Sequence, residues 1–236
     1  YRLGAENVAR LFAEDVRAAI DDLRRCGIKP AALLLDGIFA SDGVLADPAG
    51  FMQQAVALAR EEGLLYIADE VQSGFGRTGA QMWGFERHGL QPDIVTLGKP
   101  MGNGQPIAAA VVRAEVLEAF GRNARYFNTF GGNPVSCAAA NAVLEVIQGE
   151  DLLSNCAAIG AYFKAGLQGL AERYALIGDV RGAGLFVGVE LVTDRVSKAP
   201  ATDDVDGLNR HGLPAVWPVT TEAVWKRNSG RPMSMR

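Results

Sequence analysis

The segment Leu64-Leu65-Tyr66-Ile67-Ala68-Asp69-Glu70 indicates the fold class most clearly. Five apolar residues run without interruption into two carboxylates, which is typical of a strand that is buried on both faces and ends at a polar edge. Residues 31–35, 93–97 and 107–112 are short apolar runs of the same kind and predict three further strands. Four such runs indicate a sheet buried inside the protein.

Helical segments alternate with these strands. Residues 5–26 carry apolar positions at helical spacing, and the alanine-rich residues 134–148 and then 151–174 do the same. Asp47-Pro48 predicts a helix start, with aspartate at the N-cap and proline at the first helical position, and Gly63 predicts its end. The alternation predicts an α/β domain with a largely parallel sheet, followed by a smaller domain that contains a strand near 185–192.

The composition excludes several classes of partner. The 236 residues carry a net charge of -4, which gives no reason to expect nucleic acid or an anionic membrane. No apolar run reaches the roughly 18 residues that span a bilayer. The three cysteines form no Cys/His cluster, so we expect no metal site and a cytoplasmic location. We expect all three to be buried packing residues.

Asp69 and Lys99 both follow predicted strands. Ligands of open α/β sheets bind outside the carboxyl ends of the strands, so these two side chains are expected at one binding site. A lysine at a strand end can also lose solvation, which favours the nucleophilic amine.

Three blocks of sequence carry a family resemblance. Tyr66–Gly79, Thr96–Gly104 and Phe127–Pro134 resemble, in order and spacing, the signature blocks of the class III aminotransferases. The resemblance covers about residues 1–205. It implies a type I fold and pyridoxal 5'-phosphate (PLP) as the cofactor, which needs a lysine for a Schiff base and an acid for its ring nitrogen.

The resemblance assigns five site residues. Asp69 and Lys99 would be the catalytic pair: Asp69 would hold the protonated ring nitrogen, and Lys99 would form the Schiff base and then move a proton. Val71 would pack on the ring, and Gln72 would hydrogen-bond its phenolic oxygen. Thr129 would contact the cofactor phosphate of a neighbouring subunit, which implies a homodimer with shared active sites.

Several other roles stay open at this level. Thr129 could instead cap the helix that begins at Pro134. Glu70 could be structural or catalytic, and Arg77 could bind a carboxylate or brace its loop. His88 lies in a polar turn and is expected at the surface.

The resemblance also predicts the domain organisation. Residues 1–135 would be the C-terminal part of the large cofactor domain, and residues 136–206 an interdomain helix with a small α/β domain. The N-terminal half of the family pattern is missing from this chain. Residues 207–236 depart from the pattern, with Arg231-Pro232-Met233 as a faint echo of the expected ending, and we interpret them as a tail altered by a frameshift or truncation.

The blocks look closest to a branch that holds alanine–glyoxylate-type aminotransferases and phospho-lyases of amino-alcohol phosphates. The expected function is transfer of an amino group from an amine or amino acid to a 2-oxo acid. The alternatives are the phospho-lyase reaction on the same fold, or a catalytically inactive fragment.

Overall fold

The computed structural model describes residues 5–201 and forms two sheets with five helices around them. The N-terminal sheet and its helices are, in chain order, α1 Ala5–Arg25, β1 Ala32–Asp36, α2 Gln53–Glu61, β2 Leu65–Asp69, β3 Ile94–Leu97, β4 Ala109–Val112 and α3 Ala114–Asn123. The C-terminal part consists of α4 Pro134–Gly149, α5 Leu152–Arg173, β5 Ile177–Ala183, β6 Phe186–Asp194 and β7 Ala199–Pro200.

The first sheet has the strand order β1-β2-β3-β4, with β1, β2 and β3 parallel and β4 antiparallel to β3. All four predicted strands therefore exist, and the largely parallel α/β sheet is confirmed. The helices expected over 5–26, 134–148 and 151–174 are confirmed as α1, α4 and α5.

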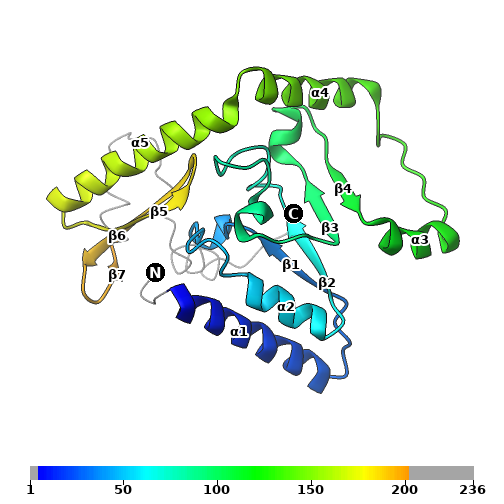
Figure 1. The fold of residues 1–236 in the computed structure, drawn as a ribbon, viewed down its shortest axis with the longest axis horizontal. Coiled ribbons are helices and arrows are strands. Elements are labelled where there is room, and N and C mark those ends of the chain that lie inside the picture. The colour runs from blue at the N-terminus through cyan, green and yellow to red at the C-terminus, as the bar shows by residue number, and fades with distance from the viewer. Residues whose placement is uncertain (1–4, 202–236) are drawn as a thin grey trace, which may run out of the picture.

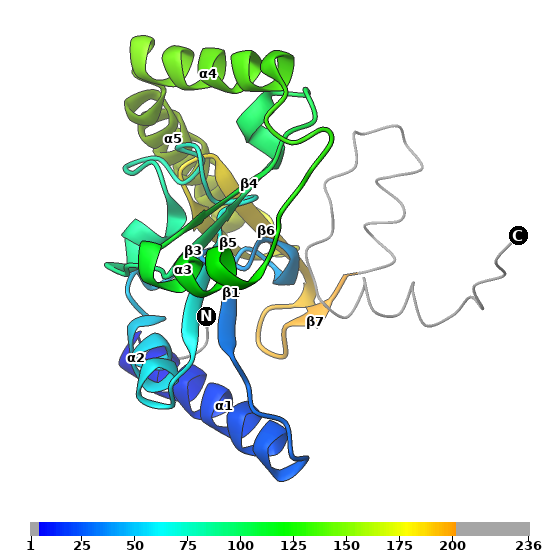
Figure 2. The same cartoon turned by 90° about the vertical axis from the view of Figure 1, so that its right-hand side faces the viewer.

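The core lies between this sheet and two helices. Helices α1 and α2 pack side by side below the sheet, and α4 crosses the opposite end of the molecule (Figure 1 and Figure 2). Tyr66 and Ala68 of β2 are buried together with Met52 and Val56. Burying several such side chains contributes about 1.5–3 kcal/mol each, so this face holds the domain together.

The expectation that the strands are buried on both faces is wrong for β1. Leu34 is 57% exposed, and its register partner in β2, Ile67, is only partly buried. The described helices α1 and α2 cover the face that carries Leu35 and Tyr66. A continuous apolar run therefore does not distinguish a strand covered on one face from one covered on both.

The predicted start of the second helix is also wrong. Helix α2 begins at Gln53 and not at Pro48, because Gly50 has φ +86, which an α-helix does not allow. Asp47 pairs with Arg87 instead of capping a helix. The predicted end is confirmed, since Gly63 follows the helix with φ +80.

The second sheet is the antiparallel hairpin β5–β6 with the short strand β7 at its edge. Helix α5 packs against it. This arrangement agrees with a small α/β unit, while the limits at residues 135 and 206 stay predictions. The predictions for residues 207–236 lie outside the described residues.

Candidate active site

Asp69 is the last residue of β2, with Asp36 and Thr96 as its register partners on the neighbouring strands. Its Oδ1 accepts hydrogen bonds from the backbone N–H of Val71 (3.1 Å) and from Oγ1 of Thr96 (3.0 Å). Within residues 5–201, Oδ2 has no hydrogen-bond partner. One carboxylate oxygen is therefore anchored, and the other can accept a hydrogen bond from a ligand.

Lys99 opens the 3₁₀ turn Lys99–Gly102 directly after β3 and Gly98. Its φ of +32 lies in a region that residues other than glycine rarely adopt, and such strain is concentrated at functional sites. The side chain is exposed, so the expected loss of solvation is wrong for this chain. In the described part of the chain, its amine has no hydrogen bond or ion pair.

A cleft of about 460 Å³ brings three of the predicted site residues together. Val71, Gln72 and Lys99 line it, and residues 185–187 of the β5–β6 hairpin form its other side. Nε2 of Gln72 donates a hydrogen bond to Oγ of Ser41 at 3.3 Å. Asp69 does not line this cleft, but it is joined to it through the backbone N–H of Val71.

Thr129 lies away from this cleft, in the exposed segment between α3 and α4. Its alternative role as helix cap is wrong, because Asn133 caps α4 by accepting a hydrogen bond from the backbone of Ser136 at 2.9 Å. Phe127 and Phe130 on either side of Thr129 are 85% and 82% exposed. The assigned phosphate contact stays a prediction.

Glu70 is fully buried and has a structural role. Its carboxylate accepts hydrogen bonds from the backbone N–H groups of Gly84 (2.7 Å) and Phe85 (2.9 Å) and from Oγ of Ser73 (3.0 Å). Burial raises the pKa of this carboxyl, and the three donors act against the rise. Glu70 thus closes the loop that carries Val71, Gln72 and Arg77.

The sequence did not single out Asp36 or residues 185–187. The Asp36 carboxylate accepts hydrogen bonds from the backbone N–H groups of Ile38 and Ala40, and burial raises its pKa. The sequence contained a pattern that could have identified Asp36, because Asp36 ends an apolar strand as Asp69 does. Residues 185–187 reach the cleft from a separate sheet, which no local pattern reveals.

The prediction of a surface position for His88 is wrong. His88 is fully buried against Phe51, with Nε2 2.7 Å from the carbonyl oxygen of Gly37. The backbone N–H of Gly50 donates to Nδ1 at 3.1 Å, so the ring is the neutral tautomer with its proton on Nε2. Burial lowers the pKa of His88, which agrees with that neutral form.

The cysteine prediction holds for one residue of three. Cys156 is buried, Cys137 is partly buried and Cys26 is exposed, and all three are free thiols. The described residues contain no group of three side chains suited to a metal ion. No helix among them is long and apolar enough to cross a membrane.

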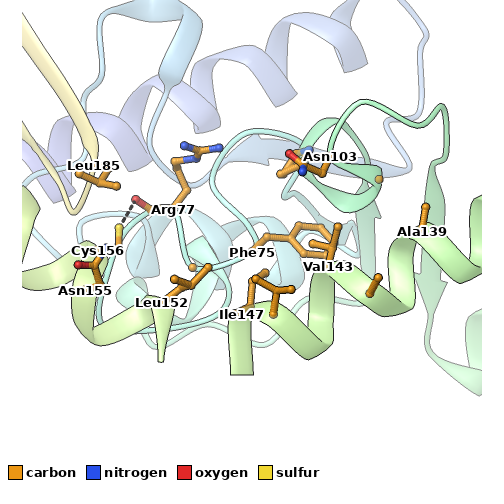
Figure 3. Close-up of a pocket in the computed structure, with 15 residues that line it drawn as sticks. Phe75, Arg77, Asn103, Ala139, Val143, Ile147, Leu152, Asn155, Cys156 and Leu185 are labelled. Atoms are coloured by element: carbon orange, nitrogen blue, oxygen red, sulfur yellow. Dashed lines mark hydrogen bonds between the residues drawn. The ribbon is translucent and has the colours of Figure 1, made fainter. Parts of the chain in front are cut away.

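A second, apolar cavity of about 550 Å³ lies behind the cleft, between α4, α5 and the loop around Phe75 (Figure 3). The side chains of Phe75, Val143 and Ile147 meet there, while the guanidinium of Arg77 points away from them. Arg77 and Leu185 line both hollows.

The donor set fits PLP on structural grounds. At the carboxyl ends of two adjacent parallel strands lie an amine without a partner in the described chain and an apolar side chain, which line the cleft, and a free carboxylate oxygen, which does not. An open α/β sheet with this arrangement defines a PLP-binding domain of the type I fold.

Comparison with known proteins identifies the family. The model of the family "Aminotransferase class-III" matches residues 6–223, beyond the point near Asp206 where the resemblance was expected to end. The chain belongs to this family of PLP-dependent enzymes.

Individual relatives support the same family. The chain is 43% identical over 195 residues to an alanine–glyoxylate aminotransferase 2-like protein of Drosophila melanogaster, covering 82% of this chain and 40% of that protein. It is 40% identical to ethanolamine-phosphate phospho-lyase homolog 1 of Caenorhabditis elegans, covering 80% of this chain and 41% of that protein.

Among solved structures, a phospholyase from Arthrobacter in complex with phosphoethanolamine matches with a TM-score of 0.81 and 40% identity, covering 88% of this chain and 50% of that one. An omega-transaminase from Thermomicrobium roseum matches with a TM-score of 0.78 and 34% identity, covering 87% and 46%. The chain spans about half the length of these structures and about 40% of the curated relatives.

Proposed function

We propose that the protein to which this chain corresponds transfers an amino group from an amine or amino acid to a 2-oxo acid. The observation that carries the proposal is that Lys99, whose amine has no partner within residues 5–201, and Asp69, whose Oδ2 is free, lie at the carboxyl ends of neighbouring parallel strands. Membership of the class III family supports the same reaction.

Each site residue has a defined task in this reaction. When bound, PLP supplies an electron sink for the charge that develops at the substrate carbon. Oδ2 of Asp69 would accept the hydrogen bond of the ring nitrogen and keep that nitrogen positive. Val71 would pack on the ring, and Gln72 would donate to its phenolic oxygen. Nζ of Lys99 would hold the cofactor first and would then carry a proton from the substrate α-carbon.

The test is an absorbance spectrum of the chain with added PLP, recorded beside Lys99→Ala and Lys29→Ala variants. Lys29 is also exposed and lies far along the chain from the site, so its replacement is the matched control. We expect a visible band that borohydride abolishes, which Lys99→Ala loses and Lys29→Ala keeps. A band that survives in Lys99→Ala would refute the assignment of Lys99.

A second candidate reaction is elimination of phosphate from an amino-alcohol phosphate. It is supported by the match to a phospholyase structure that holds phosphoethanolamine and by the relative named a phospho-lyase homolog. Release of inorganic phosphate from phosphoethanolamine favours the lyase. Amino transfer to pyruvate without phosphate release favours the aminotransferase. Neither activity, despite a cofactor band, would identify the isolated chain as an inactive fragment.

We also propose that the protein works as a homodimer in which Thr129 reaches the cofactor phosphate of the partner. The exposed aromatic rings of Phe127 and Phe130 beside Thr129 support a subunit contact there. Sedimentation of the chain and of a Phe127→Ser, Phe130→Ser double variant tests it, and identical masses for both would refute the contact.

A cytoplasmic location stays a proposal. It is supported by three free thiols in the described structure, whereas a human relative carries the word mitochondrial in its name. Imaging of the full-length protein in its native cell decides between the two compartments.

A further inference from the structure

Arg77 is held in place by hydrogen bonds to its backbone, and its side chain contributes no such bond within the described residues. Its carbonyl oxygen accepts hydrogen bonds from the backbone N–H of Leu185 (3.1 Å) and from Sγ of Cys156 (3.2 Å). The guanidinium forms no hydrogen bond or ion pair with any residue of the described range 5–201. Bracing of the loop is thus done by the carbonyl, and the guanidinium is available to a ligand.

The position of Arg77 is set by close backbone packing. A Cβ placed on Gly184 would lie 2.4 Å from the carbonyl carbon of Thr78, and one on Gly79 would lie 3.1 Å from Cα of Ala157. The backbone next to Arg77 is therefore in tight contact with the hairpin and with α5. An anchored backbone fixes the point from which the Arg77 side chain extends, which reduces part of the entropy lost on binding.

The cleft beside Arg77 is cationic. Arg77 and Lys99 both line it, and the described residues that line it include no aspartate or glutamate. The guanidinium is exposed and turned away from the apolar side chains of α4 and α5 (Figure 3). A guanidinium is planar and offers paired N–H donors, which suit a carboxylate or a phosphate better than a neutral group.

We propose that Arg77 binds the anionic group of the amino substrate, a carboxylate or a phosphate, while Lys99 serves the amine end of the same molecule. This assignment rests on the proposed function and narrows it to amino compounds that carry an anion. Arg77 is then a specificity-determining residue, because a neutral amine gains nothing from it.

The test follows the loss of the PLP band as an amino donor is added to the cofactor-loaded chain. Three donors are compared: L-alanine, phosphoethanolamine and 1-aminopropane, which carries no anion. The variants are Arg77→Ala, Arg77→Lys and the control Arg122→Ala, whose side chain is exposed on α3 and pairs with Glu118.

We expect Arg77→Ala to weaken the apparent affinity for at least one anionic donor about tenfold or more, and to leave 1-aminopropane and the band itself unchanged. Arg77→Lys keeps part of the affinity, and Arg122→Ala keeps all of it. A loss confined to phosphoethanolamine assigns the phosphate, and a loss confined to L-alanine assigns the carboxylate. An equal loss for all three donors, or no loss for any, overturns the proposal.

If the unmodified chain shows no PLP band, the proposed function fails for this chain, and the role of Arg77 is tested separately. Calorimetric titration with inorganic phosphate and with acetate then compares the unmodified chain, Arg77→Ala and Arg122→Ala. Binding that only Arg77→Ala abolishes supports the anion site. Binding that Arg77→Ala leaves intact, or no binding to the unmodified chain, overturns it.

Discussion

Replacing Glu70 by alanine tests how far one buried carboxylate holds the loop of the active site. Three donors point at this carboxylate, from Gly84, Phe85 and Ser73, at 2.7 to 3.0 Å. A hydrogen bond to a charged group contributes about 1.5–3 kcal/mol, and a buried donor left without a partner costs about 1–3 kcal/mol. Removal of the desolvated carboxylate offsets part of this loss. We therefore expect Glu70→Ala to lower the free energy of unfolding by about 3–5 kcal/mol.

Urea denaturation of the chain measures this loss. Glu70→Gln keeps the shape of the side chain but turns an amide N–H toward a backbone N–H. We therefore expect Glu70→Gln to lower the free energy of unfolding by about 2 kcal/mol. The matched control is Glu145→Ala, an exposed helical glutamate, with a change within about 0.5 kcal/mol. A loss below about 1 kcal/mol in Glu70→Ala would show that water replaces the carboxylate without cost, and the reasoning would fail.

Three further outcomes follow from the packing. Gly160→Ala would place a Cβ 2.1 Å from a carbonyl oxygen of the β5–β6 hairpin, so thermal unfolding should show that the free energy of unfolding falls by about 3 kcal/mol or more. Gly166→Ala on the same helix meets open space, so the free energy of unfolding should rise by up to about 1 kcal/mol. Because burial lowers the pKa of His88 below 6.5, only the unfolded chain takes up its proton as the pH falls past 6.5. The free energy of unfolding should therefore fall by up to about 1.4 kcal/mol per pH unit, a slope that His88→Gln reduces. Asn133→Ala should cost about 1 kcal/mol of cap energy in urea denaturation.

The sequence predicted the part of the site that a single sheet creates. Asp69 ends β2 and Lys99 follows its parallel neighbour β3, so the rule for open sheets predicted that both residues lie at the same edge of the sheet. The burial of His88 was not predictable, because both of its hydrogen-bond partners are backbone groups. The N–H of Gly50 donates to Nδ1, and the carbonyl oxygen of Gly37 accepts from Nε2. Backbone partners leave no trace in the pattern of side chains.

The other wall of the cleft was not predictable for a related reason. Leu185 lies more than a hundred residues after Val71, in the turn that joins β5 and β6 of the second sheet. Its contact with the loop depends on close approach of Gly79, Gly160 and Gly184. A glycine that permits such approach resembles, in sequence alone, any glycine that ends a helix or forms a turn.

This junction also has a consequence for function. The loop after β2 carries Val71, Gln72 and Arg77, and near Gly79 its backbone is in tight contact with the hairpin and with α5. The Arg77 carbonyl accepts from both of those elements at once. A change that displaces the hairpin is therefore expected to shift the loop that carries Val71, Gln72 and Arg77, because the turn of the second sheet lines the same cleft as this loop.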